Sequence, residues 1–499
     1  MANTNNKNII ICADGTGNKG GYTPDSNVYK TYNGVDLHTA RQISYYDNGV
    51  GTSTNKFWRA LSGAFGFGFQ RNVQDLYRFL AMNYEPGDRV FLFGFSRGAA
   101  TVRAFLGFIA CCGLVKGKNL PHEKLEKYTR DAFDAYRHSR SDPQRAKEFC
   151  EHENSHHVID IHFVGVWDTV SALGLPGWFD RLGLISIVLT KLFNLVDRLL
   201  NIVWKHHFYR YELSNNIKHA YQALALDDAR SAFKPMVWNE NGFKGKVEQV
   251  WFAGMHSNVG GGYEREGMAN VALYWMLVRA ADKKLKLKPG FIEQCEEDAN
   301  VNGRLYDSRD GLAILYPFHP RQVEALCAGK LVGTIGIHET VFERMKMKTA
   351  NYAPLRIPGT FKVAYTDLKK SGQTCTPVDD KHWPKAVSRV SALIRLRKVN
   401  YVGLFLLTLS LLALVIYTWT GHVDYWGRSG LPGDIADVMD YLTPFMFENL
   451  VELAVMRCPL VTMAALACLW LFWTYNKLLR RHTVRAAIIV REIVMKNIK

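Results

Sequence analysis

The chain has 499 residues, more than one hydrophobic core usually holds, so we expect an enzyme-sized domain and a further element. Hydrophobic residues make up 48% of the sequence, which excludes an intrinsically disordered protein. The net charge of +16 fits nucleic acid, an anionic membrane surface or a soluble basic protein, and does not choose among them. The nine cysteines include no CxxC pair, so we expect reduced thiols and no disulfide framework, metal or cofactor.

The chain begins with a polar stretch, residues 1–8, that has neither the basic nor the apolar part of a secretory signal peptide. Export by the general route is therefore not expected. After this stretch, four short apolar runs predict buried strands: residues 8–13, 89–93, 162–166 and 247–252. Residues 73–83 and 100–111 have apolar side chains at helical spacing. Buried strands that alternate with helices predict an α/β fold, with a mostly parallel sheet and helices on both faces.

Residues 183–204 differ from their surroundings, because their dense apolar side chains are interrupted by Lys191, Asp197 and Arg198. This stretch is too polar to span a membrane easily. We predict an amphipathic helical insertion that forms a lid over the site or binds a membrane interface. An ordinary core helix is the alternative.

Two later stretches, residues 402–419 and 459–475, contain no charged side chain at all. Each is close to the roughly 20 residues that a helix needs to cross a bilayer, and Trp and Tyr stand at their ends. We therefore predict a C-terminal transmembrane hairpin with helices at about 401–419 and 456–475. Two buried core helices are the alternative.

Charged residues around these stretches predict an orientation. Basic residues flank the pair on both sides: Lys381, Lys385, Arg389, Arg395, Arg397 and Lys398 before it, and Lys477, Arg480, Arg481 and Arg485 after it. The connection, residues 421–450, is mainly acidic. Positive-inside bias then places the protein in the inner membrane with its catalytic domain on the cytoplasmic side. We divide the chain into a catalytic domain, residues 1–385, and a membrane-anchoring region, residues 386–499.

The sequence GFSRG, residues 94–98, follows an apolar strand and precedes a helix. This is the context of the GxSxG nucleophile elbow, in which the glycines leave room for a strained turn and the serine is the nucleophile. Ser96 is therefore the candidate nucleophile, with a turn or N-cap serine as the alternative. The backbone N–H of Arg97, at the start of the following helix, is a candidate oxyanion donor.

An α/β-hydrolase serine needs an acid and then a histidine, each on a loop after a later strand. Asp168 follows the strand predicted at 162–166, and His256 follows the strand predicted at 247–252. We therefore predict Asp168 as the orienting acid and His256 as the base. His338 is a rival base, and Asp227 or Asp228 is a rival acid, although their contexts look helical rather than like strand ends.

Seven motifs, taken in order, carry a family resemblance: residues 11–18 (ICADGTGN), 45–52 (YYDNGVGT), 83–104 (NYEPGDRVFLFGFSRGAATVRA), 165–170 (GVWDTV), 220–238 (AYQALALDDARSAFKPMVW), 251–263 (WFAGMHSNVGGGY) and 337–345 (IHETVFERM). From about Asn8 to about Pro358, the chain resembles the α/β-hydrolase family catalogued as domain of unknown function 2235. That family includes type VI secretion lipase effectors.

The resemblance implies Ser96, Asp168 and His256 as the catalytic triad, and phospholipid acyl esters as the substrate. It also implies a second oxyanion donor in the loop after the first strand, from the backbone N–H of Gly15 or Thr16. Asp14 in the same loop is interpreted as a loop-shaping residue.

The sequence departs from the family at two places. Asn258 stands where the family usually has Asp, and Tyr209 with Arg210 stands where the family has His and Asp. The loss of an acid at 258 makes Asp168 the sole orienting carboxylate, and it leaves open a change in activity.

The sequence thus predicts a serine phospholipase that acts on membrane phospholipids as an antibacterial toxin or a defence effector. An enzyme tethered to a bilayer meets lipid at high effective concentration, which favours this substrate. The expected partners are an immunity protein or secretion machinery, and no nucleic acid. The alternative is a non-catalytic protein that binds or permeabilises membranes with a degenerate hydrolase domain, which an activated-serine probe would distinguish.

Overall fold

The computed structural model describes residues 6–15, 18, 20–21, 24–38, 41–49, 68–170, 208–307, 309, 318–419 and 459–498. The chain divides into two compact units. One contains residues 1–316, 320–379 and 494–499, and the other contains residues 317–319 and 380–493. The predicted insertion at 183–204 lies outside the described residues.

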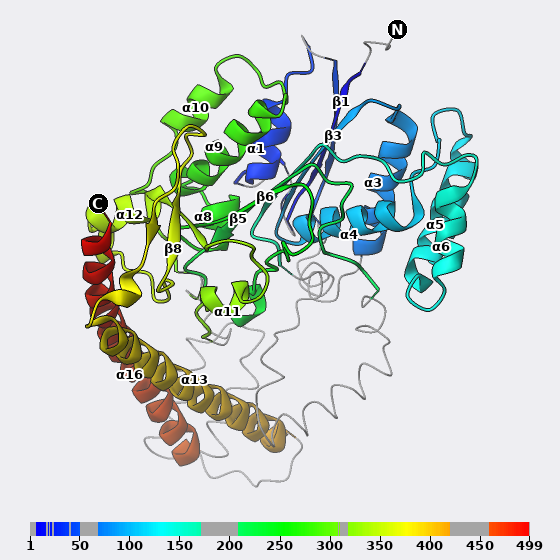
Figure 1. The fold of residues 1–499 in the computed structure, drawn as a ribbon. Coiled ribbons are helices and arrows are strands. Elements are labelled where there is room, and N and C mark those ends of the chain that lie inside the picture. The colour runs from blue at the N-terminus through cyan, green and yellow to red at the C-terminus, as the bar shows by residue number, and fades with distance from the viewer. Residues whose placement is uncertain are drawn as a thin grey trace. The chain divides into compact units, whose positions relative to one another are not determined.

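The first unit is built on a sheet to which the described residues contribute nine strands, in the order β2-β1-β3-β4-β5-β6-β7-β8-β9 (Figure 1). The strands are β1 Asn8–Ala13, β2 Gln42–Asp47, β3 Arg89–Phe95, β4 Phe163–Trp167, β5 His219–Ala225, β6 Lys246–Phe252, β7 Gly336–His338, β8 Phe361–Ala364 and β9 Thr374–Cys375. Each neighbouring pair is parallel, except for β8 and β9. The predicted mostly parallel sheet is confirmed.

Helices cover both faces of this sheet (Figure 1). The longer ones are α1 Asn27–Gly34, α3 Phe69–Asn83, α4 Ser96–Cys112, α5 His122–His138, α6 Pro143–Glu151 and α9 Gly267–Asp282. Shorter helices are α8 His256–Gly260, α10 Phe291–Glu297, α11 Val323–Cys327 and α12 Glu339–Lys346, with 3-10 turns at Ser231–Phe233, Thr349–Asn351 and Pro377–Asp379. The helices on both faces are as predicted.

Strand β1 shows why the sheet is buried on both faces. Successive side chains of a strand point to opposite faces. Ile9 and Ile11 pack in one core with residues of α3, α4 and α5, whereas Ile10 and Cys12 pack in the other core with residues of α1 and α9. All four side chains are fully buried. A continuous apolar run is therefore what this strand requires.

The strand order reverses at β1, because the chain passes from β1 to β2 on one side and then to β3 on the other. In open α/β sheets, ligands bind at the carboxyl ends of the strands beside such a reversal. Asp14 follows β1 there, and Ser96 follows β3. The topology therefore places the GxSxG serine at the position where this architecture forms sites.

Two long helices, α13 Trp383–Trp419 and α16 Pro459–Asn497, make up most of the described part of the second unit, and the last four residues of α16 belong to the first. Among the described residues, no helix is both long and apolar enough to cross a membrane. The predicted transmembrane hairpin, and the embedding in the inner membrane that depended on it, are therefore not supported. The apolar stretches are the ends of 37- and 39-residue helices whose other halves carry the basic residues. Residues 420–458, including the predicted acidic connection, lie outside the described part of the chain.

A glycine substitution tests the close approach of α4 to the end of β1. A Cβ at Gly98 would lie 2.2 Å from the Ala13 carbonyl oxygen and 2.4 Å from that of Asp14. We expect Gly98→Ala to lower the free energy of unfolding by about 1–3 kcal/mol, since the helix must move away, although alanine favours helix. Gly333→Ala is the control, because a Cβ there meets nothing within 4 Å and should cost less than about 0.5 kcal/mol. If urea unfolding shows the same loss of unfolding free energy in both variants, this packing is contradicted.

Candidate active site

Ser96 occupies a sharp turn between strand β3 and helix α4. Its backbone φ of 57° lies in the left-handed region, which residues other than glycine rarely adopt. A Cβ at Gly94 would lie 2.7 Å from the Ala99 Cα, so neither glycine of the motif tolerates a side chain without movement. The turn has the strained geometry of a nucleophile elbow, and Ser96 is 8% exposed.

The ring of His256 lies between Ser96 and Asp168. His256 Nε2 is 2.8 Å from Ser96 Oγ, and His256 Nδ1 is 2.5 Å from Asp168 Oδ2. His256 begins α8, after β6, and Asp168 follows β4 with a φ of 41°. The three side chains that the sequence pointed to therefore lie in one hydrogen-bonded row, brought together from the carboxyl ends of three parallel strands.

The protonation of this row follows from its contacts. An ionised carboxylate only accepts, so Nδ1 of His256 carries the proton and Nε2 accepts from the Ser96 hydroxyl. Burial opposes ionisation of Asp168. The charge and hydrogen bonds of Arg321, with the hydrogen bond from His256, outweigh the effect of burial and hold the pKa of Asp168 well below its usual range. Burial lowers the pKa of His256, although Asp168 opposes this shift. A neutral imidazole facing a hydroxyl can act as a general base.

Aromatic rings enclose the imidazole of His256. The ring centroid of Phe95 lies 4.7 Å from that of the imidazole, and the ring of Phe233 meets it edge to face at 5.0 Å. The guanidinium of Arg230 stacks on the ring of Phe233, with its central carbon 3.5 Å from the ring centroid. These rings exclude water from the histidine and fix its orientation.

The rival base His338 is a core residue. It is fully buried, its Nδ1 lies 2.8 Å from Thr340 Oγ1, and its Nε2 lies 3.0 Å from Thr366 Oγ1. Its ring stacks on Phe252 with centroids 4.5 Å apart. Because both ring nitrogens are used by threonines, His338 is not placed to serve Ser96. His338 ends strand β7 and is also the N-cap of helix α12, so its predicted helical context is right in part.

The rival acids also have other partners. Asp227 Oδ2 accepts from the Gly254 backbone N–H at 2.7 Å and from the Tyr352 hydroxyl at 2.7 Å. Asp228 is paired with Arg230 at 2.6 Å and accepts from the backbone N–H of His256 at 3.2 Å, not from its ring. Both follow strand β5, so the helical context expected for them was wrong. They shape the loop that carries His256.

The loop after β1 is organised around the buried carboxylate of Asp14. It accepts from the Ser26 hydroxyl at 2.5 Å, the Tyr46 hydroxyl at 2.6 Å and Asn18 Nδ2 at 3.0 Å, in addition to the Gly15 backbone N–H at 2.6 Å. Burial raises the pKa of Asp14, against these donors. Asp14 thus has the contacts of a loop-shaping residue.

The expected oxyanion donors have different outcomes. A Cβ at Gly15 would lie 3.2 Å from the Ser96 Cβ, so this loop does border the serine. The N–H of Gly15, however, is taken up by Asp14, which argues against Gly15 as a donor in this arrangement. Thr16 lies outside the described residues. The N–H of Arg97 belongs to the first turn of α4, the end of the helix at which the helix dipole favours negative charge.

The two departures from the family pattern have structural roles. Asn258 Oδ1 accepts from the Met255 backbone N–H at 3.2 Å, and its Nδ2 donates to the Arg304 carbonyl at 3.1 Å. An aspartate could not make the second bond. Tyr209 is buried against aromatic rings, and the backbone N–H of Arg210 donates to the Tyr136 hydroxyl at 2.8 Å.

Arg321 is the site residue that sequence reasoning missed. Its guanidinium meets both oxygens of Asp168, with Nη1 2.6 Å from Oδ1 and Nη2 2.7 Å from Oδ2. The two residues are 153 positions apart, and the surrounding PFHPRQ carries no motif that would have indicated the pairing. Only the need of a buried carboxylate for a positive partner points to such a residue.

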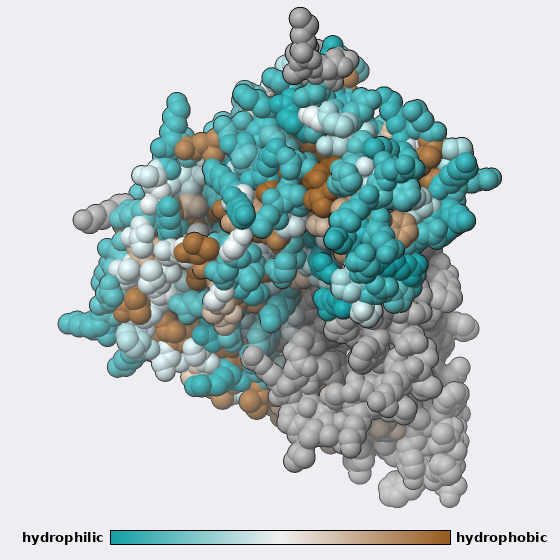
Figure 2. Space-filling model, turned by 45° about the vertical axis from the view of Figure 1, so that its right-hand side comes forward, coloured by the Kyte–Doolittle hydropathy of each residue, from teal (hydrophilic) through white to brown (hydrophobic). Residues whose placement is uncertain are grey.

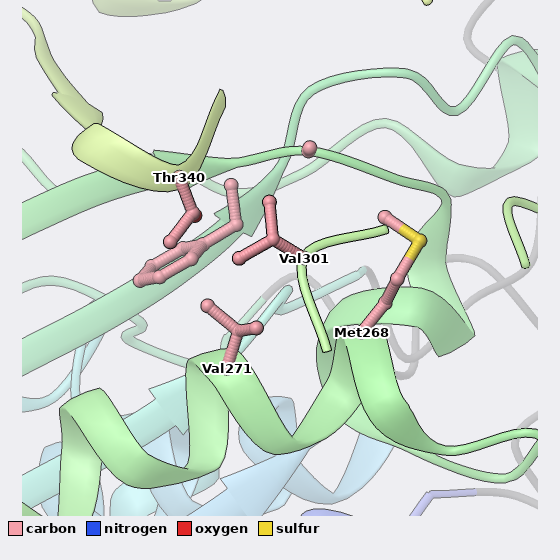
Figure 3. Close-up of a pocket in the computed structure, with 6 residues that line it drawn as sticks. Met268, Val271, Val301 and Thr340 are labelled. Carbon is pink, nitrogen blue, oxygen red and sulfur yellow. The ribbon is translucent and has the colours of Figure 1, made fainter. Parts of the chain in front are cut away.

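A small apolar pocket lies beside α9 and the end of β6 (Figure 3). Its lining consists of Phe252, Ala253, Met268, Val271, Val301 and Thr340. None of these residues belongs to the hydrogen-bonded row, and none is charged, so this pocket has no part in the chemistry described above. No group of three metal-ligating side chains occurs among the residues that the structure describes.

Comparisons with known proteins show which family the chain matches. The family model described as "T6SS, Phospholipase effector Tle1-like, catalytic domain" matches residues 7–279. The chain is 28% identical over 253 residues to the uncharacterized protein YEL023C of Saccharomyces cerevisiae, a region that covers 46% of this chain and 32% of the yeast protein. The chain thus spans about a third of that relative. A crystal structure of an uncharacterized protein from Pseudomonas aeruginosa matches with a TM-score of 0.36 and 16% identity, over 62% of this chain and 50% of the other.

The pH dependence of stability tests the core position of His338. Burial, with the nearby charge of Arg279, lowers the pKa of His338 to about 3. Folding therefore favours the neutral ring, and this contribution is present above the unfolded pKa near 6.5 and is lost as the pH falls toward 3. Between pH 6.5 and 4, we expect the wild type to lose up to about 1.4 kcal/mol more per pH unit than His338→Gln in denaturant unfolding. Equal pH slopes would contradict the assignment.

Proposed function

The chain belongs to the family of type VI secretion phospholipase effectors with a Tle1-like catalytic domain, and we propose that it is a serine lipase that hydrolyses acyl esters of membrane phospholipids. The observation that carries this proposal is the row of Ser96, His256 and Asp168, with contacts of 2.8 and 2.5 Å. The mostly parallel sheet with a GxSxG turn supports an α/β-hydrolase-like fold. The site uses no cofactor in this mechanism.

The proposed reaction has two halves. Ser96 Oγ attacks the ester carbonyl while its proton passes to His256 Nε2, and the resulting imidazolium protonates the leaving alcohol as the acyl–serine forms. Water then attacks the acyl–serine, again with His256 as the base, and the fatty acid leaves with Ser96 restored. Asp168 keeps the imidazole in the required tautomer and stabilises its charged form.

The tetrahedral oxyanion needs donors beside Ser96. We propose the backbone N–H of Arg97 as one of them, since it points from the first turn of a helix whose N-terminal dipole also favours negative charge. The loop that follows β1 is the source of the second donor in this proposal, because Gly15 lies against Ser96.

The family supports an effector role, as an antibacterial toxin or as a defence protein that damages membranes, with an immunity protein as partner. The alternative of a non-catalytic hydrolase relic fits less well. In a domain that has lost catalysis, nothing would select for a serine with a positive φ in line with a buried histidine and a buried aspartate. The departures at 209, 210 and 258 do not favour it, since they have structural contacts.

The second unit provides a surface for contact with lipid. Most of the exposed large hydrophobic side chains among the described residues lie on α13 and α16: Leu396, Val399, Val402, Leu406 and Leu409 on the first, and Leu466, Trp470, Leu471, Trp473, Tyr475, Leu478, Val484 and Ile489 on the second. Hydrophilic residues predominate among the coloured residues of the face shown in Figure 2, with hydrophobic ones in small groups. Exposed tryptophans beside basic side chains suit the bilayer interface.

Replacement of the nucleophile tests the proposed chemistry. Ser96→Ala and His256→Ala should each reduce ester hydrolysis by about 10⁴-fold or more with folding intact, since nucleophile and base act as one unit. Labelling by a fluorophosphonate should disappear in Ser96→Ala, because only an activated serine reacts. His338→Gln is the matched histidine control and should keep labelling. A wild-type protein that resists the probe and releases no fatty acid from phospholipid would contradict the proposal.

The lipid contact is tested with vesicles of phosphatidylglycerol and phosphatidylethanolamine. Trp470 and Trp473 are 62% and 44% exposed, and replacing both with serine removes two large interfacial anchors. We expect at least a tenfold loss of vesicle binding in flotation assays, corresponding to about 1.4 kcal/mol. Val332→Ser, at a 74% exposed apolar residue of the first unit, is the control and should bind as the wild type does. Unchanged binding by the double variant would rule out this surface.

A further inference from the structure

We propose that Arg321 is a positioning residue of this site, which compensates the charge of Asp168 and thereby keeps His256 neutral and ready to accept the serine proton. This inference rests on the proposed function and adds a residue from beyond the matched region 7–279. Arg321 is 4% exposed and Asp168 is fully buried, so their contact is shielded from solvent.

The geometry of the pair is that of a fork. Two guanidinium nitrogens meet two carboxylate oxygens at 2.6 and 2.7 Å. The guanidinium is itself fixed by the carbonyls of Ala225, 2.5 Å from Nη1, and Phe233, 2.7 Å from Nη2. Asp168 Oδ1 additionally accepts from the Ala225 backbone N–H at 2.9 Å. Because a bidentate contact fixes the carboxylate plane, it also fixes the direction in which Oδ2 accepts from His256.

The charges lead to the same role. A lone buried carboxylate would draw a proton or a positive partner, and the nearest titratable partner of Asp168 is His256. Without Arg321, the buried pair would become neutral by protonating His256, which would remove the base. With Arg321 present, the carboxylate is already compensated, and a proton on His256 would leave the group with a net positive charge. Arg321 therefore favours the neutral imidazole.

The other charged groups near His256 do not cancel this effect. Asp228 accepts from the His256 backbone N–H and is paired with Arg230, so these two charges compensate each other. Asp227 is bound to the Gly254 N–H and the Tyr352 hydroxyl. Its pKa is raised to about 6 by burial, against those two bonds. Ser96 is neutral. The imidazole ring itself is bonded to Asp168, whose carboxylate is held by Arg321.

Two substitutions separate the charge of Arg321 from its shape. Arg321→Gln keeps a hydrogen-bond donor and removes the charge, whereas Arg321→Lys keeps the charge and loses the planar fork. Arg344→Met is the matched control, because Arg344 is also buried but donates to the carbonyls of Val301 and Gly303 rather than to a carboxylate.

Three measurements on the full chain are made for each variant: the titration of His256 by NMR of ¹³C-labelled histidine, the pH profile of kcat/KM on a soluble ester, and the rate of fluorophosphonate labelling. We expect Arg321→Gln to raise the His256 midpoint and the acidic limb by about one pH unit or more, which reduces labelling below that limb about tenfold. Arg321→Lys should keep the midpoint within a few tenths of a unit and lower kcat through poorer alignment. Arg344→Met should leave all three unchanged.

The outcomes distinguish this inference from the proposed function. A loss of activity in Arg321→Gln with an unmoved His256 midpoint would overturn the inference and leave Arg321 as a structural residue. A shifted midpoint in a protein whose Ser96 is never labelled would support the role of Arg321 and refute the lipase. If Arg321→Gln does not fold, Arg321→Lys decides, because a raised midpoint in a variant that keeps the charge contradicts the argument.

Discussion

The interaction on which the site depends is the solvation of one buried charge. Asp168 has no water-exposed surface, so the protein must supply every group that stabilises its ionised form. It does so with the guanidinium of Arg321, the Nδ1–H of His256 and the backbone N–H of Ala225. Each donor comes from a different segment, and the carboxylate therefore fixes the positions of those segments as well as the tautomer of the histidine.

The parallel sheet explains how these segments meet. Because strands β1 and β3 to β6 run in the same direction, their carboxyl ends lie along one edge, and each ends in a loop with a polar side chain. Asp14, Ser96, Asp168, Asp228 and His256 all belong to these ends. Glycines at 94 and 98 then allow the nucleophile turn to press against the loop after β1. The side chains of the site lie close together because the parallel sheet brings their strand ends to one edge.

The sequence predicted the parts of this arrangement that leave a local signal. The apolar run at 8–13 coincides with β1, and GFSRG identified the turn that carries Ser96. Strand β5, with the mixed sequence HAYQALA, and β7, with three residues, have no comparable periodicity. For this reason the sequence does not show that Asp227, Asp228 and His338 stand at strand ends. The charge-free stretches in α13 and α16 predict membrane-spanning helices, but the composition of such a window does not show that each belongs to a helix of 37 or 39 residues.

Arg321 gives the chain a property that concerns its synthesis rather than its chemistry. The proposed nucleophile, acid and base all precede residue 257, and the family match also ends well before Arg321. A nascent chain that has emerged only this far contains all three reacting side chains, but the carboxylate among them still lacks its counter-ion. The site is therefore completed only when the segment around Arg321 folds back onto strand ends made much earlier. In the proposed lipase, the serine therefore lacks its complete site until residue 321 has been made, and the smallest active fragment is longer than the region that sequence similarity marks out.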